Sequence, residues 1–116
     1  MRVAVASSDG KVINQHFGKA TQFLIFELNK YSYKFIELRI NQPACAASEF
    51  GSHNESRLEQ TMNKISDCSV VLCSRIGTGI KELLQKKGIR AIEAPFPIED
   101  ELKMIMRRQR CYKTKR

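Results

Sequence analysis

The side chains best suited to chemistry in this sequence are two histidines and two cysteines in three separate segments. His16 lies in a connection between two strand-like runs, Cys45 and His53 lie in a later connection, and Cys73 ends an apolar run. Thiolate and imidazole ligands together suit zinc, copper or iron–sulfur clusters. Each residue also has a plain structural interpretation: a local turn for His16, a tight loop of small residues for Cys45 and a helix start for His53. For Cys73, the apolar run favours simple burial.

A glycine-rich segment follows Cys73 directly and reads Ser-Arg-Ile-Gly-Thr-Gly over residues 74–79. Backbone amides at a glycine-rich helix start can receive an anion, and the Arg75 guanidinium can add positive charge there. The segment lacks the Lys-Ser/Thr pair of a phosphate-binding P-loop, so the spacing of Gly77 and Gly79 alone is a weak signal.

The elements that must position these residues follow from periodicity and turn signals. Strands are predicted at 2–7, 21–28, 33–40, 69–73 and 89–94, with a short extended piece at 11–13 and a hairpin turn around residues 29–30. A helix begins near Ser52 or Asn54, because two capping boxes compete, and it continues with an apolar stripe of Leu58, Met62 and Ile65. A second helix runs from the Gly77–Gly79 segment to Gly88, and a third follows Pro97 with acidic residues first and arginines last.

The order of these elements predicts one sheet and brings the three segments together. Right-handed β-α-β crossovers are satisfied by a five-stranded mixed sheet of order 3-2-1-4-5, in which the second strand is antiparallel. With about three helices, this is a ribonuclease H-like, three-layer α/β fold. Strands 1, 3 and 4 then end at one edge, so the connections that hold His16, Cys45 and Cys73 share a rim, where open α/β sheets bind their ligands.

Length, composition and charge indicate one globular domain. The chain has 116 residues, of which 42% are hydrophobic, and no apolar run approaches the roughly 20 residues that span a bilayer. We therefore expect a cytoplasmic protein with reduced cysteines and no membrane partner. The net charge of +8 is concentrated at the end, because residues 103–116 hold seven basic and no acidic side chains and residues 1–102 hold 13 basic and 12 acidic ones. A short basic tail is more often a solvated helix end than a nucleic-acid-binding arm.

Taken together, short motifs over most of the chain resemble the dinitrogenase iron–molybdenum cofactor-binding family, which includes the NifX type and the C-terminal domain of NifB proteins. The matching motifs are Asn14-x-His16-Phe17-Gly18-x-Ala20 with Phe23, Pro43-x-Cys45, Arg57-Leu58, Asp67-Cys68-x-Val70-Val71-Leu72-Cys73-Ser74-Arg75-Ile76-Gly77, Gly88-Ile89 and Glu93-Ala94. The resemblance divides the chain into a cofactor-binding domain at 1–102 and, at 103–116, a helix end with a basic tail outside the family pattern.

The resemblance implies a non-catalytic domain that binds or carries an iron–sulfur cluster, the iron–molybdenum cofactor or its precursor, in nitrogenase cofactor assembly or a related process. Its partner would be a protein that donates or accepts the metallocluster. The resemblance implies His16 and Cys45 as ligands, with His53, Cys73 and Arg75 near the anionic cluster. The full set of candidate cofactor-binding residues is Asn14, His16, Phe17, Gly18, Cys45, His53, Cys73, Arg75, Gly77 and Gly79, and the candidate metal ligands are His16, Cys45 and Cys73.

Three other functions stay open from the sequence. A generic metal or redox-cluster binder unrelated to nitrogen fixation would use the same thiols and imidazole. A nuclease would need clustered carboxylates, yet the first strand has none and Asp9 beyond it lacks an obvious partner. A nucleic-acid partner would depend on the basic tail alone.

Overall fold

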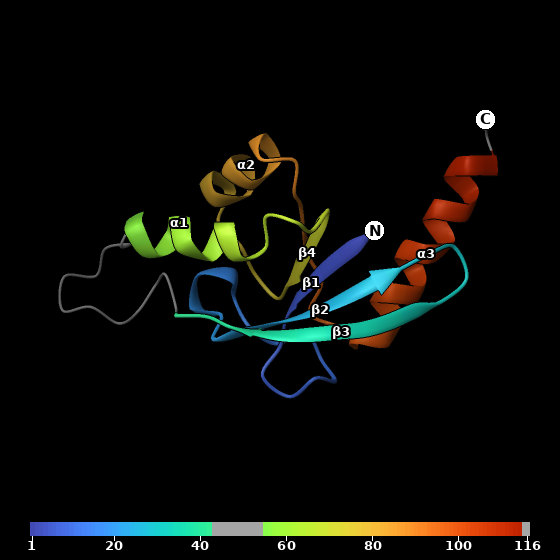
Figure 1. Ribbon diagram of the computed structural model, residues 1–116, viewed down its shortest axis with the longest axis horizontal. Coiled ribbons are helices and arrows are strands. Elements are labelled where there is room, and N and C mark those ends of the chain that lie inside the picture. The colour runs from blue at the N-terminus through green and yellow to red at the C-terminus, as the bar shows by residue number, and fades with distance from the viewer. Residues whose placement is uncertain (43–54, 115–116) are drawn as a thin grey trace.

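The computed structural model describes residues 1–42 and 55–114, and it contains a single mixed sheet with the predicted strand order (Figure 1). The strands are β1 (Arg2–Ala6), β2 (Gln22–Leu28), β3 (Tyr33–Ile40), β4 (Val70–Cys73) and β5 (Arg90–Glu93), in the order β3-β2-β1-β4-β5. β2 is antiparallel to both β1 and β3, whereas β1, β4 and β5 are parallel. The predicted topology is therefore confirmed.

Helices cover both faces of this sheet and make three layers. The helices are α1 (Glu55–Lys64), α2 (Thr78–Lys86) and α3 (Ile98–Thr114). Met62 of α1 and Leu84 of α2 share one buried cluster with Ala4 and Phe23 of the sheet. The buried side chains of α3 pack on the other face, and Figure 1 shows α1 and α2 on the side of the sheet opposite α3. Because successive residues of a strand point to opposite faces, β1 supplies Val3 and Val5 to the α3 side and its alanines to the other.

Several element boundaries differ from the sequence prediction. The extended piece expected at 11–13 is reduced to an isolated bridge between Val12 and Pro97. Burial along β3 does not alternate strictly from residue to residue, because the register between β2 and β3 shifts between Ile25 and Phe26. The competing α1 starts at Ser52 and Asn54 lie outside the described residues, as do Cys45 and His53.

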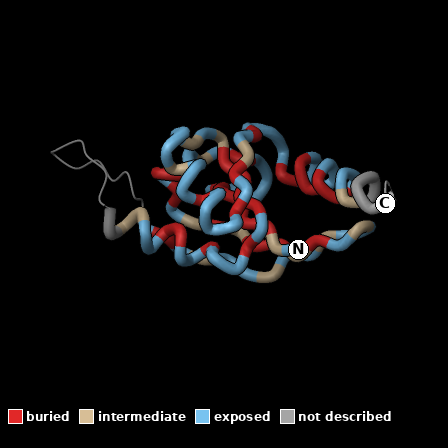
Figure 2. The backbone as a smooth tube through the Cα atoms, turned by 90° about the horizontal axis from the view of Figure 1, so that it is seen from above, coloured by how far each residue is buried: buried red, intermediate tan, exposed pale blue. Residues whose placement is uncertain are grey.

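The distribution of burial sets the core apart from the surface (Figure 2). Burial is continuous along the central strands: β1 is buried from Val3 to Ala6, and β4 throughout. Cys68, which precedes β4, is buried too, and burial raises the pKa of its thiol to about 12. None of the helices in residues 1–42 and 55–114 is long and apolar enough to cross a membrane.

Candidate functional site

The loop that follows β1 and the loop that follows β4 run side by side. The backbone N–H of Ser74 donates to the carbonyl of Gln15 at 2.9 Å, and the N–H of Phe17 donates to the carbonyl of Arg75 at 2.9 Å. These bonds make a parallel bridge between His16 and Arg75, which continues the β1–β4 pairing beyond the ends of the strands. The residue that ends up beside His16 is thus Arg75, at the strand edge where the sequence predicted the three segments to meet.

The residues around His16 hold its loop in one conformation. Phe17 begins a single 3₁₀ turn (Phe17–Lys19) and has 0% exposure, with its ring centroid 5.9 Å from that of Phe23. Gln15 and Thr21 bond to each other twice across the loop, at 3.0 and 3.2 Å. Asn41, which is buried, donates from its side chain to the carbonyl of Ala20 at 2.9 Å. Because His16 itself is exposed between these fixed points, its imidazole is presented to solvent on a rigid support.

A pocket of about 490 Å³ opens where the two loops meet. It is lined by His16, Gly18, Lys19, Arg75, Ile76, Gly77, Gly79, Ile80 and Glu93. Among its ionisable residues, Lys19 and Arg75 are cationic and Glu93 is the single carboxylate. Neither cation forms an ion pair within the part of the chain that the structure describes. The pocket is therefore suited to an anionic ligand that offers a metal to an imidazole.

The start of α2 forms one wall of the pocket. Gly77 caps this helix without a side-chain hydrogen bond, and the first turn holds no acidic residue. A Cβ atom added at Gly77 or Gly79 would meet nothing within 4 Å, and neither glycine has a positive φ. Packing and backbone conformation therefore do not explain these glycines, whereas side chains there would obstruct access to the amides of the helix start.

Glu93 is the functional candidate that sequence reasoning missed. It comes from the last residue of β5, and its Oε2 accepts a hydrogen bond from the backbone N–H of Ile76 at 2.8 Å. The carboxylate thus holds the Arg75–Gly77 loop in place through this hydrogen bond. The signal was present in the Glu93-Ala94 motif, but only pairing of β5 with β4 reveals which loop the side chain reaches.

The structure brings together five of the ten candidate residues, namely His16, Gly18, Arg75, Gly77 and Gly79. Asn14 instead bonds to Ser8 twice, through both atoms of its side-chain amide, and closes the first turn of the loop. Phe17 belongs to the core, and Cys45 and His53 lie outside the described residues.

Cys73 occupies the core beneath this edge and does not line the pocket. Its side chain has 0% exposure, and its sulfur lies 3.9 Å from the carbonyl oxygen of Ile92. Burial, reinforced by the nearby negative charge of Glu93, raises the pKa of the thiol to about 12 and so disfavours the thiolate that binds metals. Within residues 1–42 and 55–114, no three His, Cys, Asp or Glu side chains are grouped to hold a metal ion.

Comparison with known proteins agrees with this fold and identifies the family of the chain. The profile of the dinitrogenase iron-molybdenum cofactor family matches residues 1–108. FeMo cofactor biosynthesis protein NifB of Azotobacter vinelandii is 36% identical over 107 residues, which are 90% of this chain and 21% of that protein. Protein NifX of Rhodobacter capsulatus is 28% identical over 109 residues, which cover 90% of this chain and 67% of that one.

The chain spans about a fifth of the NifB proteins that it matches: in the Frankia alni protein, 37% identical over 91 residues, the match covers 78% of this chain and 18% of that one. Among solved structures, the crystal structure of PH0822 has a TM-score of 0.65 at 24% identity and covers 91% of this chain and 89% of that one. The NMR structure of TM1290 from Thermotoga has a TM-score of 0.55 at 18% identity, over 87% of this chain and 82% of that one. These structures establish the fold, and the match over residues 1–108 shows that the chain belongs to the dinitrogenase iron–molybdenum cofactor family.

Proposed function

We propose that this chain is a binding and carrier domain for an anionic iron–sulfur cluster, the iron–molybdenum cofactor or its precursor, in nitrogenase cofactor assembly. The observation that supports it most is the backbone bridge between His16 and Arg75, because an imidazole and a guanidinium then line the same pocket. The cluster is cargo that is bound and passed on.

The chemistry of the pocket fits such a cargo. An imidazole nitrogen of His16 binds an exposed iron or heterometal of the cluster. Lys19 and Arg75 balance the negative charge of the cluster, and the backbone amides around Gly77 and Gly79 donate hydrogen bonds to its sulfur or oxygen atoms. Glu93 opposes the charge of the cargo but holds the Ile76 amide, so it positions the loop and does not bind the cluster.

We propose His16 and Cys45 as the ligands. Cys45 comes from the connection after β3, outside the described residues, and its role follows from the family motif. Cys73 stays a prediction that its burial opposes, since ligation would need its sulfur to leave the core. His53 also stays a prediction.

Anaerobic titration of the protein with purified iron–molybdenum cofactor tests this proposal. Co-elution of iron with the protein and the absorption spectrum report binding. We expect His16→Ala and Cys45→Ala to weaken binding at least about tenfold, the usual size of losing one metal ligand or its support. Lys11→Ala is the matched control, because Lys11 is exposed in the same loop and does not line the pocket.

The same titration discriminates the generic metal binder. Stoichiometric zinc without iron binding under anaerobic conditions would contradict the cluster proposal and favour a simple metal site. Binding of the cofactor that is equal in wild type, His16→Ala and Cys45→Ala would show that the site is wrong.

We also propose that the domain does not catalyse a reaction. Asp9, the first acidic residue after β1 in the sequence, accepts hydrogen bonds from the amides of Lys11 at 2.9 Å and Val12 at 3.1 Å, so its carboxylate shapes a turn. These bonds lower its pKa, and clustered carboxylates for two-metal chemistry are missing from the described residues. We expect no nuclease activity with Mg²⁺ or Mn²⁺, and measurable cleavage that is lost in Asp9→Asn would overturn this view.

The setting of the domain is part of the proposal. The partners would be a protein that donates the cluster and one that accepts it, in the cytoplasm, with residues 1–102 as the cofactor-binding domain and 103–116 as a helix end and tail.

α3 runs through position 102 without a break and buries Ile105 and Met106. A test for nucleic-acid binding should therefore remove only residues 110–116, and we expect any weak binding by the full chain to disappear with them.

A further inference from the structure

β5 forms one edge of the sheet, and the described chain offers no strand that pairs with its outer side. The amides of Arg90 and Ala94 donate inward, to the carbonyls of Ser69 and Cys73 on the β4 side, at 2.9 and 2.8 Å. Because backbone groups alternate in direction along a strand, the N–H and C=O groups of Ala91 and Glu93 face outward. Such a row of free backbone groups is a template for an added strand.

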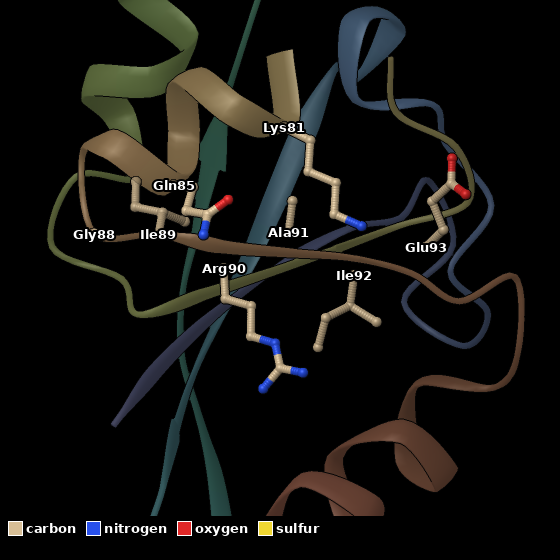
Figure 3. Close-up of a pocket in the computed structure, with 8 residues that line it drawn as sticks. All are labelled: Lys81, Gln85, Gly88, Ile89, Arg90, Ala91, Ile92 and Glu93. Atoms are coloured by element: carbon tan, nitrogen blue, oxygen red, sulfur yellow. The ribbon is translucent and has the colours of Figure 1, made fainter. Parts of the chain in front are cut away.

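Side chains lie on both faces of the sheet beside this edge (Figure 3). A pocket of about 740 Å³ runs along β5, and Lys81 and Gln85 of α2 lie over its upper side in the close-up, whereas Arg90 and Ile92 point to the other side. A second pocket of about 530 Å³ continues from Arg90 and Ile92 over the apolar side chains of Val70 and Ile105 to Arg108.

The charges beside the edge favour one kind of occupant. Lys81, Arg90 and Arg108 are exposed cations, and Glu93 is the single carboxylate that lines either pocket, where it is already bound to the Ile76 amide. We propose that this edge, which we call the β5 edge, binds an extended, acidic segment of a partner protein by strand addition. Acidic side chains of the segment face Lys81 and Gln85, and its apolar side chains pack on Ile92 and the apolar part of the second pocket. Arg90 and Arg108, which line that second pocket, add to the overall attraction for an acidic segment without pairing with it directly.

A second copy of this chain suits the edge less well. In an antiparallel pair of two β5 strands, residues whose backbone groups face outward stand opposite each other. Ala91 and Glu93 of one copy would therefore stand opposite Ala91 or Glu93 of the other copy, and Arg90 would stand opposite a residue whose backbone groups also face inward. Arg90 and Glu93 could then never stand directly opposite each other, and the positive charges of the two copies would repel.

The β5 edge adjoins the candidate cluster site, because Glu93 lines both pockets. If the proposed carrier function holds, a segment bound here brings the donor or acceptor protein next to the His16–Arg75 pocket. The docking itself does not depend on the cargo, so it is tested on the cargo-free protein.

The experiment is an NMR titration of the ¹⁵N-labelled full chain with a capped peptide of about eight residues in which Glu and Val alternate, a usual strand length. We expect chemical-shift changes at the Ala91 and Glu93 amides, and weaker binding at high salt. A peptide in which Lys replaces Glu is the control for charge, and one with alternate amides methylated is the control for backbone pairing.

Two variants locate the contact. Lys81→Glu should weaken binding of the Glu/Val peptide about fivefold, while Lys86→Glu, an equal change on α2 outside this pocket, should leave it unchanged. Ala91→Pro should abolish binding because it removes an outward N–H that no strand of the sheet uses.

Three results would overturn the proposal. The first is equal binding of the Glu/Val and Lys/Val peptides. The second is chemical-shift changes confined to β3, the strand at the other edge of the sheet. The third is self-association of the chain in sedimentation equilibrium that Ala91→Pro abolishes. The last result would show that a second copy occupies the edge.

Discussion

Two charged clusters in the described part of the chain, one just before β4 in the sequence and one just after it, differ in whether their charges are neutralised. Before β4, Asp67 bonds to Arg2 at 2.8 Å and to Arg39 at 2.7 and 2.9 Å. After β4, Lys19, Arg75 and Glu93 line one pocket, and we call these three residues the open cluster. Neither of its cations forms an ion pair within the described residues. Partly exposed charges that pair with each other add modestly to stability, whereas cations without an ion pair beside an imidazole are available to a ligand.

The first cluster connects elements that are distant in the sequence. Arg39 of β3 also donates to the carbonyl of Lys64, which ends α1, at 2.6 Å, and Arg2 of β1 bonds to Glu27 of β2. The two arginines hold the pKa of Asp67 well below its usual range, because both favour the ionised carboxylate. The Arg75 side chain forms no ion pair with another element of the described chain. Removing this side chain should therefore affect binding and not stability.

The largest expected effect concerns the support beneath the open cluster. Phe17→Ala should reduce the free energy of unfolding by about 3–5 kcal/mol, because it removes a fully buried ring. Phe35→Ala, at a ring with 50% exposure, is the control and should cost about 1 kcal/mol or less. Urea unfolding measures both, and a similar small cost for the two variants would mean that Phe17 does not anchor the His16 loop.

The central test removes one arginine from each cluster and compares the two effects. Arg75→Ala should lower affinity for iron–molybdenum cofactor about tenfold and leave stability unchanged. Arg39→Ala should instead lower stability by about 1–2 kcal/mol, discounted for the partial exposure of its partner, and leave affinity unchanged. Anaerobic titration and urea unfolding of both variants give the four values. If both arginines changed the same property, the distinction between the clusters would fail.

The pH dependence of stability sharpens the comparison further. Since the folded-state pKa of Asp67 is lowered, its stabilising contribution is present above its unfolded value and is lost as the pH falls through the folded value. We expect the stability advantage of wild type over Asp67→Asn, at most about 1 kcal/mol, to shrink below about pH 4. Thermal unfolding at several pH values measures it. In about 1 M salt the advantage should be smaller at every pH, and an advantage that grows on acidification would refute the assignment.

The smallest effect concerns Glu93, the single carboxylate of the open cluster. Glu93→Gln keeps an oxygen that can accept from the Ile76 amide but removes a negative charge from the pocket. Affinity for the cofactor should therefore rise about threefold. Glu82→Gln, at an exposed carboxylate of α2 that does not line the pocket, is the control. A fall in affinity for Glu93→Gln alone would mean that the carboxylate itself binds the cargo.

Most of the fold could be predicted because it rests on local signals. The apolar run 69–73 indicates a buried strand, and Leu58 and Met62 mark the inward face of α1, with Ile65 buried directly after the helix ends. The strand order 3-2-1-4-5 satisfies the handedness of β-α-β units, and the structure has this order. The isolated Val12 bridge and the β2–β3 register shift depend on contacts between segments, so no local pattern indicated them.

The candidate site could be predicted only in part. Strand order indicated that the His16 and Arg75 loops would share an edge, but a loop has no periodicity from which side-chain direction can be read. The sequence alone therefore did not separate His16, which is exposed, from its neighbour Phe17, which is buried. It also gave no reason to connect Glu93 to Ile76, which are 17 residues apart.

The sequence by itself determined the family motifs, the strand order and the edge at which we propose that a ligand binds, because these follow from residue types, periodicity and chain handedness. Tertiary structure decided which side chains line the pocket, which cations are already paired and which carboxylate braces the loop. Those choices depend on backbone hydrogen bonds between the ends of β1 and β4 and on the pairing of β5 with β4. Such contacts join residues that are far apart in the chain, so only the folded protein brings them together.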